Sequence, residues 1–190
     1  MRNDNINNQT VLANPNLPCP DKILSRQAAL SVDYYGFDQQ LHSGVIEIHQ
    51  AVLKDVKAFF ELIYNLRFPV EKVSPASDPT YLWDDKKLMN ANVSSGFNYR
   101  LVSGTNRVSP HGQGLAFDIN PRQNPYIRYQ DGKVIIYPDG AVWDINKPGT
   151  LFHDHPLVRF MLGRGWEWGG NWLEQSGRID YQHFQKSLTN

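Results

Sequence analysis

Apolar residues recur every three or four positions in one segment of the chain, residues 50–68. Val56, Phe59 and Ile63 recur there at intervals of three and four, with Lys and Glu between them. This spacing places apolar side chains on one face of a helix. The preceding segment, 44–49 (GVIEIH), alternates in the manner of a strand instead. The two patterns together predict a strand that leads into an amphipathic helix.

Shorter patterns divide the rest of the chain into more strands than helices. Strand-like segments are 68–73, 94–102, 115–120, 166–172 and 179–184, with a hairpin insertion in 133–143. A short helix is expected over 155–165, because Pro156 stands in its first turn and glycines close it. The polar stretch before Met89 reads as a loop or a helical turn. Strands joined by short turns predict an α+β fold, a small domain with an antiparallel sheet and flanking helices.

Length and composition favour one folded domain. The chain has 190 residues, of which 41% are hydrophobic, and this suffices for a single core. Its first 22 residues are rich in Asn and Pro, which predicts a loosely ordered arm at 1–22 and a folded domain at 23–190.

Charge and cysteine content restrict the possible partners. Nineteen basic residues balance 19 acidic ones, so no net field attracts nucleic acid or an anionic membrane. No apolar run reaches the roughly 18 residues of a membrane span, and a secretory h-region is absent from the first residues. If the protein is exported, its signal has been removed or another route is used. Cys19 is the only cysteine, so any metal must be held by His and carboxylate side chains. We expect a monomer.

The stretch SPHGQGLAFDIN, residues 109–120, places His111 in a turn and Asp118 in an apolar strand. A histidine in such a loop is most often simply solvated. A buried carboxylate without a partner costs several kcal/mol, so Asp118 needs a cation beside it. That cation is either a metal or the guanidinium of an arginine.

A second pair of polar residues stands near the end of the chain. DYQHF supplies Asp180 and His183, three residues apart and flanked by aromatic side chains. In a regular strand these two side chains face opposite sides, so they converge only if a turn or bulge intervenes; SGRID, residues 176–180, offers one. The alternative is an edge strand with one polar face. With His111 and Asp118, the pair completes two imidazoles and a carboxylate, a set suited to zinc, and a second carboxylate able to accept a proton.

The motifs resemble a known family. SPHGQGLAFDIN resembles the S-x-H-x(6)-D pattern of the VanY-like zinc D-alanyl-D-alanine carboxypeptidases and L-alanyl-D-glutamate endopeptidases, and GWEWGGNW followed by DYQHF resembles their closing segment. That group includes lysostaphin-type enzymes and the Hedgehog signalling domain. The resemblance covers roughly residues 37–184 and implies a Hedgehog/DD-peptidase-like fold.

The resemblance implies a role for each matching residue. His111, Asp118 and His183 would bind Zn²⁺, and Asp180 would be the catalytic carboxylate. Arg100 would hold the scissile carbonyl, with a plain salt bridge as its alternative. The chain departs from the family's pattern in two ways: Asp180 is Asp where several relatives have Glu, and the segment between Arg100 and His111 is short.

Three further residues are candidates for contact with substrate. Ser109 corresponds to a substrate-holding serine of the family, although it also suits a turn. Trp168 and Trp172 would line the groove, although large aromatic side chains more often pack in a core.

The implied activity is that of a zinc peptidase. Zinc would acidify a bound water and polarise the peptide carbonyl, Asp180 would take the proton and pass it to the departing amine, and Arg100 would stabilise the oxyanion. The implied substrate is the stem peptide of bacterial peptidoglycan, cut at a D-Ala-D-Ala or an L-Ala-D-Glu bond. The protein would act in the cell envelope or outside the cell, or as a phage lysin that reaches the wall after release.

Several alternatives remain open at this stage. Two histidines and a carboxylate also bind iron in oxygenases, where His-x-Asp spacing is usual. A zinc-stabilised wall-binding module without catalysis needs the ligands but not Asp180, and a structural wall protein needs neither. HDH, residues 153–155, is either a second metal-binding site or a capping segment, in which Asp154 caps the following helix. Glu167 and Glu174 are alternative bases.

Overall fold

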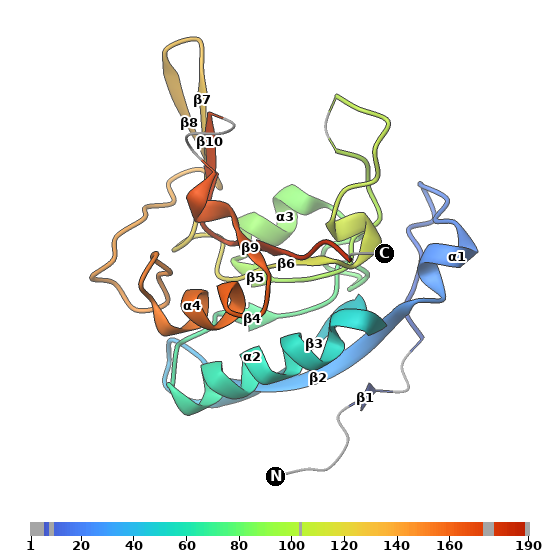
Figure 1. Ribbon diagram of the computed structural model, residues 1–190, viewed down its shortest axis with the longest axis horizontal. Helices are drawn as coiled ribbons and strands as arrows, with labels where there is room; N and C mark the ends of the chain where they lie inside the picture. The colour runs from blue at the N-terminus through green and yellow to red at the C-terminus, as the bar shows by residue number, and fades with distance from the viewer. Residues whose placement is uncertain (1–5, 8–9, 103, 173–176, 189–190) are drawn as a thin grey trace.

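One α-helix lies across a long two-stranded ribbon at the base of the molecule (Figure 1). The ribbon pairs β2 (Gln27–Tyr35) with β3 (Leu41–His49), antiparallel over the full length of both strands. A single turn of 3-10 helix, η1 (Gln50–Val52), then leads into α2 (Leu53–Asn65). The structure, a computed structural model, describes residues 6–7, 10–102, 104–172 and 177–188.

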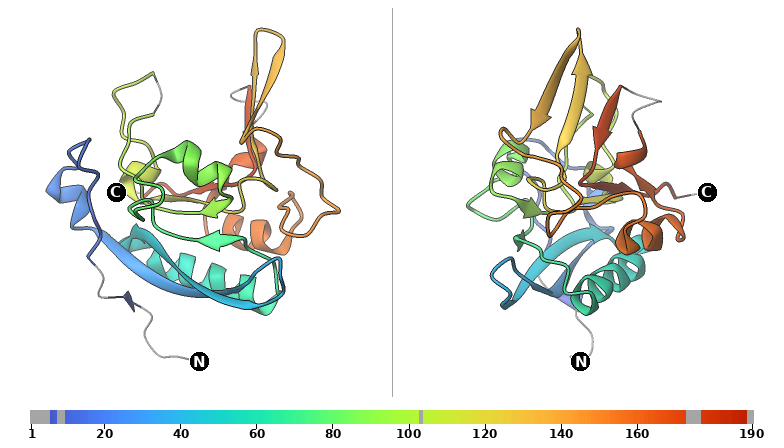
Figure 2. Two further views of the ribbon diagram at one scale, coloured as in Figure 1. Left: turned by 180° about the vertical axis from the view of Figure 1, so that it is seen from behind. Right: turned by 90° about the vertical axis from the view of Figure 1, so that its left-hand side faces the viewer.

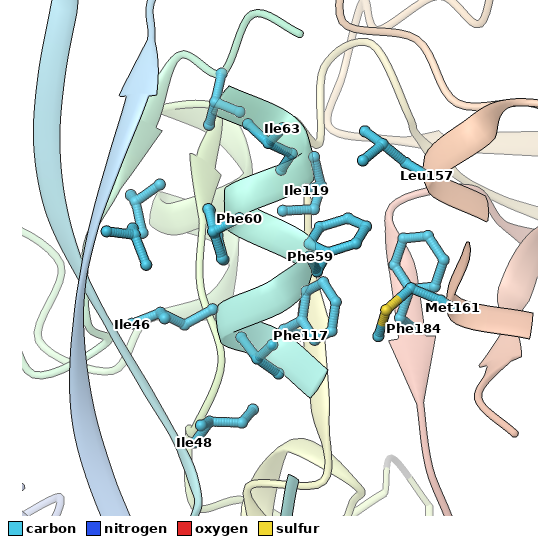
Figure 3. Packing of buried hydrophobic residues seen from close by; sticks show 14 of the residues in the cluster. Ile46, Ile48, Phe59, Phe60, Ile63, Phe117, Ile119, Leu157, Met161 and Phe184 are labelled. Carbon is cyan, nitrogen blue, oxygen red and sulfur yellow. The ribbon is translucent and has the colours of Figure 1, made fainter. Parts of the chain in front are cut away.

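The hydrophobic core forms where α2 meets the ribbon on one side and a second helix, α4 (Pro156–Leu162), on the other. Figure 3 shows the apolar face of α2 pointing into this space from the centre. Side chains from four elements around α2 meet it there: Ile46 and Ile48 of β3, Leu157 and Met161 of α4, Phe117 and Phe184. Each is almost wholly buried, and burial of one such side chain contributes about 1.5–3 kcal/mol.

A small antiparallel sheet crosses the upper side of this core and carries polar residues at its outer end. Its strand order is β6 (Ala116–Asp118), β11 (His183–Gln185) and β9 (Glu167–Trp168). The register pairs His183 directly with Asp118 and Phe184 with Phe117. Since neighbours along a strand face opposite sides, Phe117 and Phe184 enter the core while Asp118 and His183 face away from it.

A second small sheet projects from the body and is seen at the top of both views in Figure 2. Its order is β10 (Arg178–Asp180), β7 (Tyr126–Gln130) and β8 (Lys133–Tyr137). Asp180 stands at the end of β10 nearest the body, opposite Tyr126.

Shorter elements complete the described chain: β1 (Ile6–Asn7), which pairs with β2, α1 (Asp21–Leu24), the parallel pair β4 (Lys72–Val73) and β5 (Val93–Ser94), α3 (Asp85–Asn90), and the 3-10 turns η2 (His111–Gln113) and η3 (Gly169–Asn171). Among the described residues, the helices are all too short or too polar to cross a bilayer.

The expected fold class, a small α+β domain, is confirmed. Instead of one sheet, however, the strands form several small ones.

The predicted strand over 94–102 is wrong beyond its first residue. Its backbone bonds go to several different elements: Ser95 pairs with Asp118, Phe97 N donates to the carbonyl of Glu47, and Asn98 N donates to that of His111. Gly96 passes so close to the carbonyl of Glu47 that any Cβ there would collide with it. The segment is therefore an irregular connector rather than a strand with one neighbour.

Three other local predictions need correction. The hairpin turns at Asp131–Gly132, where glycine has φ +71°, and not within 133–143. Helix α4 is capped by His155, whose Nδ1 accepts from Leu157 N at 3.2 Å, and not by Asp154. Strand β2 was not predicted at all, although Leu30, Val32 and Tyr34 are buried alternately along it.

The described part of the predicted arm contacts the domain. Val11 packs with Phe97 and Tyr99 in a small separate cluster, joined by Leu17 and Cys19. Residues 10–22 are thus held more closely than a loose arm would be. The domain boundaries themselves stay a prediction.

Candidate metal centre

Three side chains from two strands and a turn converge on one point beside the β6–β11 pair. His111 Nε2 and His183 Nδ1 are 3.0 Å apart, and Asp118 Oδ1 lies 3.2 Å from the first and 3.0 Å from the second. All three residues are at least nine-tenths buried. Their ligand atoms form a group that could hold a metal ion. The three candidate ligands of the sequence analysis therefore lie together.

The spacing of these atoms fits a tetrahedral ion. Zinc binds His nitrogen and carboxylate oxygen at roughly 2.0–2.2 Å, so two ligand atoms of a tetrahedral site lie roughly 3.3 Å apart. The three observed separations of 3.0–3.2 Å approach that value. Three protein ligands leave a fourth position open, which is the arrangement of catalytic rather than structural zinc sites.

Local backbone structure orients His111. The turn η2 is closed by Ser109, whose Oγ accepts from Gly112 N at 2.9 Å. His111 Nδ1 donates to the carbonyl of Gly96 at 2.8 Å. Because Nδ1 holds the ring proton, Nε2 is left with a lone pair pointing at the centre. Gly96 was missed from the sequence, where only its small size gave a signal.

The electrostatics of Asp118 are those of a ligand. Burial alone would raise the pKa of its carboxyl, but the imidazoles of His111 and His183 beside it hold that pKa well below its usual range. In return, although burial opposes a charge on His111, Asp118 raises the pKa of that imidazole. The carboxylate is thus built to be charged next to a cation, and the arginine partner considered from the sequence is not what it contacts.

Asp180 lies within electrostatic reach of this centre. A two-residue turn at Tyr181–Gln182 separates β10 from β11, so Asp180 and His183 reach the same region. This turn follows Asp180, whereas the predicted one, SGRID, begins at Ser176, outside the described residues. Oδ1 of Asp180 is buried and accepts no hydrogen bond from any described residue. Burial raises the pKa of its carboxyl to about 7, and His183 and Arg100 lower it while Asp118 raises it.

The glycines of GWEWGGNW explain how Asp180 fits there. A Cβ on Gly169 would lie 2.9 Å from the Cβ of Asp180 and still closer to its carbonyl oxygen. Only glycine lets η3 pass against the end of β10. The motif therefore serves the packing around Asp180.

Arg100 lies within electrostatic reach of the centre. Its charge lowers the pKa of both His111 and Asp180. One guanidinium nitrogen, Nη2, pairs with Asp85 Oδ2 of α3 at 3.3 Å, which is the salt bridge considered as the alternative. Its Nε is buried, with no acceptor among the described residues. That Arg100 holds the scissile carbonyl stays a prediction, and its Nε is a donor that could do so.

The two tryptophan candidates differ. Trp168 is 2% exposed and its indole nitrogen donates to the carbonyl of Tyr181, so it is a core residue and does not line a groove. Trp172 is half-buried, with its ring 5.2 Å from that of His183 and the Arg178 guanidinium over it. Ser109, buried in the turn, is held by the bond to Gly112 described above, and its contact with substrate stays a prediction.

A cleft of about 1000 Å³ adjoins the centre through Trp172 and Gln185. Its described lining contains three cationic side chains and no carboxylate: Arg107, Arg178 and Lys186. Lys186 is already paired with Asp55 at 2.8 Å. The cleft wall is therefore basic and partly aromatic.

The remaining candidates are not part of this group. His153 contacts Asn171 and His155 caps α4, so the described residues 153–155 do not form a metal-binding site. Glu167 accepts a hydrogen bond from Gln185 at 2.7 Å. Glu174 lies outside the described residues.

Comparison with known proteins agrees with this geometry. Residues 103–186 match a family model described as D-alanyl-D-alanine carboxypeptidase. The expected resemblance to this peptidase family is confirmed over that segment. The matched segment contains the three metal-binding candidates and Asp180, whereas Arg100 precedes it. No curated protein and no solved structure gives a significant match.

Proposed function

We propose that the protein is a zinc metallopeptidase that hydrolyses a peptide bond in the stem peptide of bacterial peptidoglycan. The observation that carries the proposal is the convergence of His111 Nε2, Asp118 Oδ1 and His183 Nδ1, together with the buried Oδ1 of Asp180, which has no hydrogen-bond partner among the described residues. A purely structural zinc site has no use for that fourth group. Its presence favours catalysis over a wall-binding module.

The ion would be held by His111, Asp118 and His183. When bound, it supplies Lewis acidity, which polarises a peptide carbonyl and makes water more acidic. Three observations support zinc: the ligand atoms are two imidazole nitrogens and a carboxylate oxygen, Asp118 is buried, and the spacing of the three atoms suits a tetrahedral ion.

Asp180 is the proposed general base and acid. Its buried Oδ1 can accept a proton from the attacking water and then return it to the departing amine. A carboxyl whose pKa is about 7 in the folded protein exchanges a proton readily near neutral pH. Gly169 lets η3 pass directly against Asp180, which holds this carboxylate, shorter than the Glu of several relatives, at the end of β10.

Arg100 is the proposed oxyanion donor. Its Nε is buried with no acceptor among the described residues, and such a donor is costly unless a ligand completes it. A peptide carbonyl oxygen that gains negative charge in the transition state meets this need. The ion pair with Asp85 holds the other end of the guanidinium.

The cleft supports an acidic peptide as substrate. Stem peptides of peptidoglycan carry free carboxylates, and Arg107 and Arg178 on the cleft wall complement them. Trp172 offers an apolar surface between this wall and His183. The proposed place of action is therefore the bacterial cell wall.

The test is digestion of defined stem peptides by the zinc-loaded protein. One peptide ends in D-Ala-D-Ala and another contains an L-Ala-D-Glu bond, and mass spectrometry identifies the products. Cleavage of either, abolished by a chelator and by Asp180→Asn, is expected. A zinc-loaded wild-type protein that binds peptidoglycan but cleaves neither peptide would establish the wall-binding module instead.

A further inference from the structure

The two metal-binding histidines are oriented in different ways. His111 Nδ1 donates to a backbone carbonyl, that of Gly96, which can only accept, so the position of the ring proton is settled. His183 presents Nδ1 to the centre, and its Nε2 faces the side-chain amide of Gln185, with 3.1 Å between Nε2 and Oε1. An amide has an acceptor end and a donor end. By itself it does not settle which ring nitrogen of His183 keeps a lone pair.

Glu167 removes that ambiguity. The amide nitrogen of Gln185 lies 2.7 Å from Glu167 Oε2, and a carboxylate offers only acceptors. The NH₂ end of Gln185 must therefore point to Glu167, which turns its oxygen towards His183 Nε2. That oxygen accepts a hydrogen bond from Nε2–H, so the ring proton stays on Nε2 and the lone pair is on Nδ1, the nitrogen that lies beside Asp118 Oδ1.

Strand pairing builds this chain of contacts. Gln185 follows His183 by two residues, so both side chains leave the same face of β11. The register of β11 and β9 sets Gln185 directly opposite Glu167. Glu167 is exposed and Gln185 half-buried, so the chain runs from solvent to the buried ligand.

We propose that Glu167 and Gln185 are positioning residues, which fix His183 in the tautomer that binds metal through Nδ1. The inference rests on the proposed function only in requiring that the centre binds zinc. It gives Glu167 a role other than that of the alternative base, because its carboxylate acts through Gln185 and His183.

The test is the zinc affinity of single and double variants, measured by competition with a chromogenic chelator. Gln185→Leu removes the acceptor and should weaken zinc binding by roughly 10- to 100-fold, the usual cost of losing an outer partner of a ligand histidine. Glu167→Lys places a donor opposite Gln185, which turns the amide round, and should weaken binding nearly as much. Glu167→Gln offers Gln185 both an acceptor and a donor, so it should weaken binding less than Glu167→Lys does.

A double variant separates orientation from charge. If Glu167→Lys acts through the amide of Gln185, it should add almost nothing in a Gln185→Leu background. Full additivity of the two effects would show that the lysine charge alone weakens binding, and equal affinity of all variants would show that neither residue positions His183; both results overturn the proposal. Thermal unfolding of the metal-free Glu167 variants should be unchanged, because Glu167 is exposed. A wild-type protein that binds no zinc would overturn the proposed function itself.

Discussion

Asp118 and Asp180 are two carboxylates at one site, yet their surroundings are opposite. Asp118 is the last residue of β6, paired with His183 of β11, and imidazole nitrogens of His111 and His183 both lie within 3.2 Å of its Oδ1. Asp180 lies at the end of β10, with one oxygen buried and no hydrogen-bond partner among the described residues. The pKa of Asp118 is lowered by its neighbours, whereas burial raises that of Asp180 to about 7.

The difference teaches what each carboxylate can do. A group that stays charged beside two imidazoles is suited to hold a cation permanently. A group that takes up and loses a proton near neutral pH is suited to move protons. Environment, and not residue type, divides the two roles between chemically identical side chains.

The strongest way to break this comparison is to make the same substitution at both positions, beginning with Asp118. Asp118→Asn keeps the shape but removes the anionic ligand, so zinc affinity should fall by more than the roughly 10- to 100-fold that an outer partner contributes. Hydrolysis should be lost with the metal. Elemental analysis after gel filtration measures the metal content, and His183→Ala should give the same result. Full zinc occupancy in Asp118→Asn would exclude it as a ligand.

Asp180→Asn should have the opposite signature. The amide keeps the size of the side chain but cannot accept the proton of the attacking water, so turnover should fall by roughly a hundredfold to ten-thousandfold while zinc stays bound. Turnover of a stem peptide and zinc content are measured on the same preparation. If Asp180→Asn loses its zinc, the carboxylate is a ligand; if it keeps both zinc and full turnover, the base lies elsewhere and Glu174 is the next candidate.

Arg100 sharpens the comparison because its charge reaches Asp180. Arg100→Lys keeps the charge but loses the planar fork and the buried Nε donor, so turnover should fall roughly ten- to a thousandfold with zinc retained. Asp85→Asn removes the half-exposed ion pair together with a charge that raises the pKa of Asp180, and it should cost little stability. Equal turnover of Arg100→Lys and wild type would return Arg100 to a purely structural salt bridge.

A third buried carboxyl, Glu47 of β3, tests whether burial alone produces the raised pKa. It is 1% exposed, its carboxyl accepts a hydrogen bond from Ser77 Oγ alone among the described residues, and burial raises its pKa to about 7. The folded protein holds the Glu47 proton more tightly than the unfolded chain does. The stability gained from this is fully present below about pH 4.5 and is lost as the pH rises through 7. The loss amounts to at most about 3 kcal/mol.

Glu47→Gln should remove that dependence. Between pH 5 and pH 8, the free energy of unfolding of wild type should fall relative to that of the variant, as measured by urea denaturation. Glu71→Gln, at an exposed position, is the control and should behave like wild type. Parallel pH profiles for wild type and Glu47→Gln would show that Glu47 is ionised in the folded protein at no cost.

Some parts of the fold could be predicted because one segment determines them. The amphipathic spacing around Phe59 predicts α2, and Pro156 with the following glycines predicts α4; both are confirmed. The connector after Ser94 could not be predicted, because its backbone N–H groups bond to Glu47, His111 and Asp118, which come from three distant places in the chain. Local pattern carries no information about such partners.

The same limit applies to the site. His111, Asp118 and His183 could be identified by residue type and order, and their convergence depends on the pairing of β6 with β11. The support of these ligands by Gly96 and Gln185 was not foreseen, since one acts through its carbonyl and the other through a register with Glu167. Trp168 was misplaced because sequence alone does not tell a core indole from a groove-lining one.

The most direct test of the central claim is a metal titration of the chelator-treated protein, followed by hydrolysis of a peptidoglycan stem peptide. Zinc should restore hydrolysis in proportion to the amount added and saturate at one ion per chain, because His111, Asp118 and His183 form a single centre. Iron added in the same way should restore less. Hydrolysis that survives complete removal of metal, or that iron restores in preference to zinc, would contradict the account.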